Sequence, residues 1–278
     1  MPALLTIAHL TLYDARRRKM LTAAALCGAL FLAVFWTVAI LVARDMETNP
    51  PTFLQRQINL VILSLFGLYA ANFFSVLLAA LLPVDALSGE IDSGVMQTLA
   101  SKPVRRSDIV LGKWLGFGVV TVAYFLVLAG GVLAATRLIA GYQQLNLGIA
   151  MPLMLLELVL LHTVSIAGGT RLGTVTNGIM TLGFYGVAFI GGWVEQLGAL
   201  GGIQSARTVG VALSLFSPPD SMWRLAAYYM QPEILRSLGA AGPFTVATVP
   251  SALMVWWAAG FTVIALAFAV VSFRRRQL

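Results

Sequence analysis

Charged residues are scarce in this sequence: Asp, Glu, Lys and Arg together make up only 10% of its 278 residues. Soluble globular domains carry about 25% of such residues, so this chain has too few to cover a surface that faces water. Hydrophobic residues make up 59% of the chain, and the mean hydropathy is +0.88. This composition excludes a soluble globular protein and indicates that lipid is the main solvent of the chain.

Residues that perform chemistry are scarce as well. The single cysteine, Cys27, excludes an intrachain disulfide, and the only histidines, His9 and His162, argue against a dedicated metal site. The motifs HExxH, CxxC and Gly-x-Ser-x-Gly are absent from the sequence. A Walker A loop is absent too, because Gly112-Lys113 is followed by Trp114 and lacks the upstream glycine. We therefore expect no catalysis by this chain, no bound cofactor and no ATP site of its own.

Long apolar runs are what the sequence has in abundance. About 20 apolar residues in a helix cross the hydrocarbon core of a bilayer. Six runs approach or exceed this length: Met20–Ala43, Ile58–Val84, Trp114–Ala140, Met151–Gly168, Asn177–Val194 and Ser251–Phe273. The fourth and fifth are the shortest and are rich in glycine. We predict an all-α integral membrane protein with six transmembrane helices in a single domain, residues 1–278.

Basic residues are distributed unevenly among the connections between these runs. If six spans alternate, one side receives Arg16 to Lys19, Lys102, Arg105, Arg106, Lys113, Arg171 and Arg274 to Arg276. The short connections on the other side carry fewer bases, and acidic residues accompany them. The positive-inside rule then places both termini in the cytoplasm. The formal charge of +7 is therefore interpreted as a topology signal and not as a nucleic-acid surface.

The segment before the first span is expected to form a short amphipathic helix. Within residues 2–19, Leu5, Ala8 and Leu12 share one helical face, and four basic residues close the segment. This pattern is typical of a helix that lies on the cytoplasmic leaflet. The alternative is that these residues are simply the first turns of span one.

The long connection over residues 195–250 is half apolar but holds no complete span. The sequence Pro218-Pro219-Asp220 interrupts its apolar run, which argues against a hidden pair of spans. Irregular backbone is not tolerated where it faces lipid. We therefore expect short outer-face helices that lie on the outer membrane surface or re-enter it.

Ionisable residues inside the spans are functional candidates by default. Glu157 and His162 lie in span four, and Arg137 lies near the outer end of span three. Glu157 and His162 are roughly 140° apart around a helix, so an intramembrane enzyme built on this pair has no single site. Glu157 and Arg137 lie at similar depth, which predicts a structural ion pair between their helices. For His162 we favour an interhelical hydrogen bond.

Small and amide residues in the spans predict close helix contacts. Gly112 with Gly116, and Gly169 with Gly173, have the GxxxG spacing that lets two helix backbones approach each other. We expect Asn59, Asn72, Asn177 and Trp193 to contribute only interhelical hydrogen bonds and interface anchoring.

The connection between spans two and three, residues 85–113, has the most distinctive pattern. It begins with acidic residues and ends with basic ones. Ser88 and Ser107 are candidate caps for two short helices, and Pro103 would end the first of them. This pattern predicts a compact helical hairpin on the cytoplasmic side, with a solvated loop that carries topology charges as the alternative.

Residues 88–116, SGEIDSGVMQTLASKPVRRSDIVLGKWLG, resemble the type-two permeases of ATP-binding-cassette (ABC) transporters. Members of this family commonly share a Gly-Glu, a further Gly, a Lys-Pro or similar pair, a basic pair and a Gly-Lys. The N-terminal IAHLTLYDARRRKM, the later LFSPPDSMWRLAAYY and the final FRRRQL are also similar to family segments. Within the family, the sequence resembles the permeases of the Nos system, which serves the maturation of nitrous-oxide reductase.

The resemblance implies a permease of the bacterial inner membrane that pairs with a second copy and binds one separate ATPase subunit per permease. ATP would bind to that partner subunit. The resemblance also implies an ATPase-coupling region made of Asp85, Ser88, Gly89, Glu90, Asp92, Gly94, Lys102, Pro103, Arg105 and Arg106. Closure of the ATPase would move the coupling region and open a cavity between the permeases. A Nos-type permease could instead support copper-site maturation mechanically, through a periplasmic partner. The apolar spans suit a lipophilic cargo or such a mechanical role.

Overall fold

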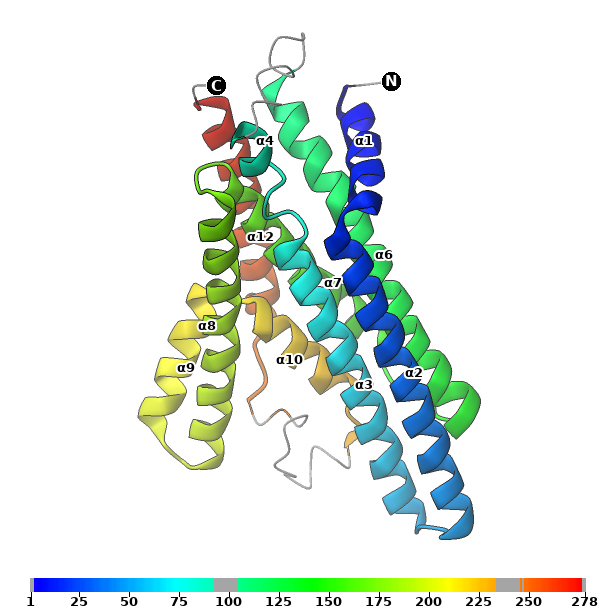
Figure 1. The fold of residues 1–278 in the computed structure, drawn as a ribbon. Helices are drawn as coiled ribbons and strands as arrows, with labels where there is room; N and C mark the ends of the chain where they lie inside the picture. The colour runs from blue at the N-terminus through cyan, green and yellow to red at the C-terminus, as the bar shows by residue number, and fades with distance from the viewer. Residues whose placement is uncertain (1–2, 93–104, 234–245, 247, 277–278) are drawn as a thin grey trace.

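The computed structural model describes residues 3–92, 105–233, 246 and 248–276, and all regular secondary structure in these residues is helical (Figure 1). Its helices are α1 (Ala3–Arg17), α2 (Lys19–Thr48), α3 (Phe53–Leu81), α4 (Ser88–Asp92), α6 (Arg106–Ala140), α7 (Leu147–Gly169), α8 (Thr174–Leu200), α9 (Gln204–Phe216), α10 (Pro219–Met230) and α12 (Ala252–Arg274). Six of these, α2, α3, α6, α7, α8 and α12, are long and apolar enough to cross a membrane. The predicted all-α, multi-pass membrane protein is therefore confirmed.

The spanning helices extend beyond the apolar runs that predicted them. The fifth run, residues 177–194, is the middle of α8, which the structure extends to Thr174–Leu200. Similarly, α6 begins at Arg106 and not at Trp114. Hydropathy marks only the part of a helix that suits lipid, whereas backbone hydrogen bonds continue a helix into polar sequence. The spans α3 and α7 are the most buried, and α2 and α12 the least.

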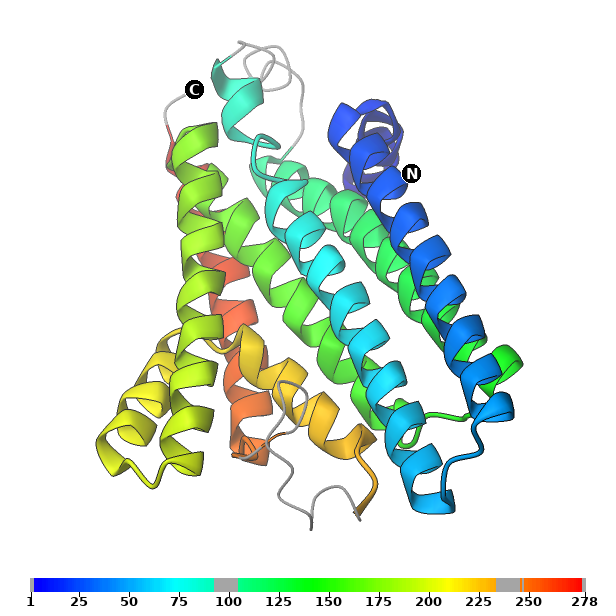
Figure 2. The ribbon, with the colours of Figure 1, turned by 60° about the horizontal axis from the view of Figure 1, so that its bottom comes forward.

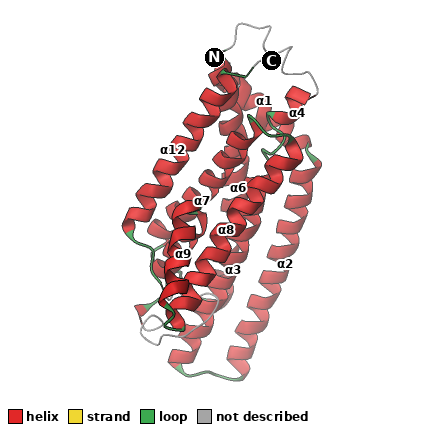
Figure 3. Ribbon diagram, turned by 90° about the vertical axis from the view of Figure 1, so that its left-hand side faces the viewer, coloured by secondary structure: helices red, strands yellow, loops and turns green. Residues whose placement is uncertain are grey.

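Both ends of the described chain lie at the same end of the bundle (Figures 1 and 3). The start of α1, the short α4, the start of α6 and the end of α12 meet there. We call it the basic end, because the described part of it carries Arg16 to Lys19, Arg105, Arg106, Arg171 and Arg274 to Arg276. The α2–α3 turn lies at the opposite end, the far end (Figure 2). This arrangement is the one that six alternating spans predict.

Helix α1 is separate from the first span and packs along α6. The helical geometry breaks at Arg18, whose backbone is extended (φ −73°, ψ 125°). Gly112 and Gly116 on α6 allow the contact, since a Cβ at Gly116 would lie 2.6 Å from the Cβ of Thr11 and 2.8 Å from the carbonyl oxygen of Ala8. The GxxxG contact is thus confirmed, with α1 as its partner. The alternative that residues 2–19 are the first turns of span one is wrong.

After α8 the chain forms two further helices at the far half of the molecule. Helix α9 packs back against α8, and glycines on both helices permit the close approach: Gly191, Gly198 and Gly210. Helix α10 starts at Pro219, a residue tolerated in the first helical turn. Most of α10 is buried, and it packs on α7, α8 and α12 (Figure 2). Short helices that lie on the outer membrane surface or re-enter it were predicted, and the burial of α10 inside the bundle does not fit the surface-lying alternative.

Candidate coupling site

The segment that follows α3 at the basic end is packed into the protein core. Residues 82–87 form a turn between α3 and α4, and Leu82, Ala86 and Leu87 are fully buried. They belong to a cluster with apolar residues of α1, α6, α7 and α12: Ala15, Ile109, Val110, Phe117, Ile166, Ala167, Ala269 and Phe273. This connection between two spans is therefore not a solvated loop up to the start of α4.

Lys113 on α6 holds the beginning of α4. Its Nζ lies 2.5 Å from Oε1 of Glu90 and donates a hydrogen bond to the carbonyl oxygen of Ala86 at 2.7 Å. Only 7% of the Lys113 side chain is exposed, against 25% of the Glu90 side chain. A buried ammonium is costly without a counter-charge. Glu90 is therefore an internal partner of α6 and not only a surface charge.

Arg18 connects the same segment to the joint between α1 and α2. Its guanidinium forms an ion pair with Asp85, donates to the carbonyl oxygen of Leu82 at 3.3 Å, and lies 4.8 Å from the ring centroid of Phe117. Because Arg18 is the residue at which the helix breaks, these contacts orient the joint. The Asp85 side chain is 47% exposed, so water screens the pair and its contribution to stability is small.

The start of α8 is attached to this segment by hydrogen bonds. The Ser88 hydroxyl donates to the carbonyl oxygen of Val84 at 3.2 Å and lies 2.9 Å from the hydroxyl of Thr174. Asn177 donates to Val84 O at 3.0 Å and to Ser165 O at 2.9 Å, as expected of an interhelical amide. The predicted cap at Ser88 is wrong, because α4 begins at Ser88 itself and the hydroxyl donates back to Val84 in the preceding turn. The second GxxxG pair, Gly169 with Gly173, does not pack as a pair against another helix, since a Cβ at Gly173 meets nothing within 4 Å.

The basic pair of the predicted coupling region lies apart from this cluster. Arg106 donates to the carbonyl oxygens of Arg274 at 3.2 Å and Arg276 at 2.5 Å, at the end of α12. The last carbonyls of a helix have no intrahelical donor, so a cation there is favourable. Arg105 is exposed. The predicted cap at Ser107 is wrong, because α6 has already begun at Arg106.

The remaining predicted coupling residues are only partly described. Gly89 lies in α4, and a Cβ at this position would lie 3.3 Å from the Cβ of Asp85. A larger residue there would therefore press on the side chain that pairs with Arg18. Gly94, Lys102, Pro103 and the side chain of Asp92 lie outside the described part of the chain, as do residues 93–104 of the hairpin predicted over residues 85–113.

Three partners in this site were not singled out from the sequence. The sequence identifies Lys113 only as a topology charge and as part of the family's Gly-Lys pair, although a single lysine directly before a long apolar run needs a partner once it is buried. Arg18 carries no such signal, because it is one of four consecutive basic residues and only the helix break distinguishes it. Thr174 likewise has no sequence feature that predicts its contact with Ser88.

Glu157 is fully buried and faces α3. Its Oε2 accepts a hydrogen bond from Nδ2 of Asn72 at 2.9 Å. Arg137 is exposed, and among the described residues it forms no ion pair with Glu157. The predicted pair is wrong, because similar depth in the membrane does not determine which way a side chain points around its helix.

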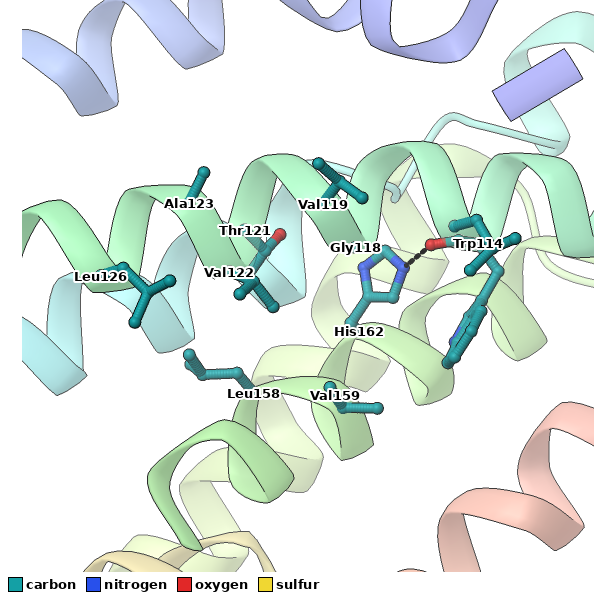
Figure 4. A pocket seen from close by; sticks show the side chains of 11 residues that line it. Trp114, Gly118, Val119, Thr121, Val122, Ala123, Leu126, Leu158, Val159 and His162 are labelled. Atoms are coloured by element: carbon teal, nitrogen blue, oxygen red, sulfur yellow. Dashed lines mark hydrogen bonds between the residues drawn. The ribbon is translucent and has the colours of Figure 1, made fainter. Parts of the chain in front are cut away.

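His162 forms the expected interhelical hydrogen bond. Its Nε2 lies 2.9 Å from the carbonyl oxygen of Trp114 on α6 (Figure 4). The indole Nε1 of Trp114 donates to the hydroxyl of Thr163 at 2.8 Å. A carbonyl oxygen only accepts, so Nε2 carries the hydrogen. A largely apolar cavity of about 440 Å³ lies beside this contact, between α6 and α7. Trp114 follows Lys113, so α7 is attached to α6 next to the residue that holds α4.

Exchanging the charges of Arg137 and Glu157 tests the assignment of their partners. We expect Arg137→Glu to leave assembly largely unchanged, because Arg137 is exposed. Glu157→Arg should sharply reduce the yield of monodisperse protein in size-exclusion chromatography, because it buries an unpaired guanidinium beside Asn72. The double variant should be as defective as Glu157→Arg. Recovery of the wild-type yield in the double variant would instead restore the ion pair as the correct interpretation.

Comparison with known proteins places the chain in a family. A family model described as "ABC-2 family transporter protein" matches residues 5–278. One curated relative, the probable ABC transporter permease protein NosY of Pseudomonas aeruginosa, is 33% identical over 121 residues, which is 43% of this chain. The alignment covers 40% of that relative's own length. Because the family match extends over nearly the whole chain, this protein belongs to the ABC-2 family of transporter proteins, as a membrane-spanning permease.

Proposed function

We propose that two copies of this permease pair and that each binds one separate ATPase subunit at the basic end, which faces the cytoplasm. The observation that carries the proposal is the attachment of residues 82–92 to three structural elements at once. A solvated loop would absorb a push from a partner. A packed segment transmits it, because close-packed interiors have low compressibility.

Each contact of the segment leads to a different part of the bundle. Asp85 connects the segment to the α1–α2 joint by its ion pair with Arg18, and Glu90 connects it to α6 by its ion pair with Lys113. Val84 and Ser88 connect it to α8 by hydrogen bonds with Asn177 and Thr174. Closure of the ATPase dimer on ATP would displace α4 and, with it, the helices attached to it. Rigid-body displacement of this kind is one of the common routes from a local event to a conformational change. The two permeases would then open a path between them or deliver a mechanical signal.

Co-purification with the ATPase tests this assignment. The tagged permease, co-expressed with its ATPase subunit, should elute with that subunit as a complex of two permeases and two ATPases. Glu90→Lys should weaken the complex and abolish the response of ATP hydrolysis to the permease, because it places a second cation beside Lys113.

Glu47→Lys is the matched control, because Glu47 is exposed at the far end of α2. It should leave complex formation and ATP hydrolysis at the wild-type level. An unchanged complex and an unchanged coupling in Glu90→Lys would remove α4 from the docking site. A reporter that places the connection between α3 and α6 outside the cell would remove the ATPase from the basic end altogether.

A second candidate function follows from the similarity to the NosY permease. In this alternative the permease supports copper-site maturation of a periplasmic enzyme through a periplasmic partner, and no bulk solute crosses the membrane. Deletion of the gene distinguishes the two. Loss of copper from the periplasmic enzyme without a change in lipophilic export favours the alternative, and the opposite result favours export.

A further inference from the structure

Three ionisable side chains are buried together where α10 meets α8 and α9. Arg224 donates from Nη1 to Oε2 of Glu195 at 2.9 Å, and its Nε lies 3.0 Å from Oδ2 of Asp220. Hydroxyl oxygens of three elements surround the guanidinium within 3.3 Å: Ser214, Ser221 and Thr248. The α8 backbone lies directly against the carboxylate, since a Cβ at Gly192 would lie 2.0 Å from Asp220 Oδ2. The cluster therefore joins α8, α9, α10 and the segment before α12.

The cluster holds two carboxyl groups but one guanidinium. If Asp220 and Glu195 are both ionised, a net negative charge remains buried, which is unfavourable. A proton on Asp220 removes this charge and leaves the Arg224–Glu195 pair intact. Burial raises the pKa of Asp220 to about 6, although the Arg224 guanidinium acts in the opposite direction; Glu195 adds to the rise.

Among the described residues, the other helices around Asp220 bring no compensating cation. Helix α7 contributes the carboxyl of Glu157, and α3 and α8 contribute the hydroxyls of Tyr69 and Tyr185, on all of which the charge of Asp220 acts. Helix α9 and the segment before α12 face the cluster with Ser214 and Thr248. In the part of the chain that the structure describes, Arg224 is the cation that acts on Asp220.

We propose that Asp220, Arg224 and Glu195 form a proton-binding latch, which holds α10 against α8 and α9 more tightly when Asp220 is protonated. The residues Asp220 and Arg224 are four apart on α10, so one helical face presents both to α8. This placement gives a role to the SPPDSMWR sequence that the ATPase-coupling site does not use. The latch lies in the far half of the molecule, away from that site (Figure 1).

The direction of the pH dependence follows from the raised pKa of Asp220. The seated helix binds the proton more tightly than a displaced or unfolded helix, whose carboxyl has a pKa near 3.8. The stabilisation is therefore complete below that value and is lost as the pH rises through about 6. Acidity at the far end tightens the latch, and neutral pH loosens it.

Hydrogen exchange of the full chain in lipid nanodiscs tests the latch at about pH 5 and about pH 7.5. Wild type and Asp220→Asn are compared at the same pH, so that the intrinsic exchange rate cancels. Asparagine reproduces the neutral carboxyl group without titrating. At about pH 7.5 the amides of α10 should exchange about tenfold or more faster in wild type, since each pKa unit corresponds to a factor of ten. At about pH 5, which lies between the two pKa values, the difference between the two proteins should be smaller by about a factor of ten.

Asp45→Asn is the control, because Asp45 is exposed at the end of α2 and accepts a hydrogen bond from Asn49. It should leave α10 exchange at the wild-type level at both pH values. A second readout needs only the wild type and applies if Asp220→Asn does not fold. The ratio of α10 exchange to α6 exchange in the wild type should rise with pH. A constant ratio there, equal exchange in the two proteins at both pH values, or faster exchange in Asp220→Asn at about pH 7.5 overturns the proposal.

Discussion

Glu90→Gln should lower the free energy of unfolding by about 3 kcal/mol, which is the low end of the effect of breaking a buried ion pair. The variant removes the counter-charge of Lys113, whose side chain is only 7% exposed. The low end applies because a quarter of the Glu90 side chain is exposed and water reaches part of the site. Chemical unfolding of the purified permease measures the effect. The coupling of ATP hydrolysis to the permease should be lost in the same variant.

The double variant Glu90→Gln with Lys113→Met separates stability from coupling. It removes both charges and leaves methionine to fill the buried space of the lysine stem, so most of the stability should return. Coupling should remain lost, because α4 is no longer held to α6. Asp85→Asn is the matched control and should cost at most about 1 kcal/mol, since its pair with Arg18 is screened by water. Equal losses in Glu90→Gln and Asp85→Asn would contradict the central role of Lys113.

Gly116→Val should detach α1 from α6. The first added carbon would lie 2.6 Å from the Cβ of Thr11 and 2.8 Å from the carbonyl oxygen of Ala8, and backbone atoms cannot rotate away as a flexible side chain can. Overpacking of this kind costs about 1–3 kcal/mol, and more when a backbone must move. Limited proteolysis should cleave near the α1–α2 joint much faster than in wild type.

The same substitution on the same helix supplies the control for this experiment. A Cβ at Gly130 meets nothing within 4 Å, so Gly130→Val should leave proteolysis and stability close to wild type. Equally fast proteolysis and equal destabilisation in both variants would mean that valine destabilises α6 regardless of its position. The effect of Gly116→Val could then not be attributed to the contact with α1.

Structural features that depend on a long stretch of residues are the ones that the sequence predicts correctly. The six spans, the separate α1 and the short helices after α8 were all predicted from runs and interruptions of apolar residues. The sequence does not predict which polar side chain contacts which other polar side chain. Glu157 was assigned to Arg137 because both lie at similar depth, but α7 turns Glu157 toward Asn72 on α3. Ser88 and Ser107 were assigned as caps, but each lies within a helix.

The sequence by itself determined that this chain crosses a membrane six times and that its basic residues gather at one end. Transfer of a helix into lipid depends on the composition of some twenty consecutive residues, and composition can be counted without knowing the fold. Only the tertiary structure decided that Lys113 holds Glu90, that Arg18 holds Asp85 and that Arg224 is shared by two carboxyl groups. Such pairs depend on the rotation of each helix about its axis and on glycines that set its distance from the next, and packing of the whole bundle sets both.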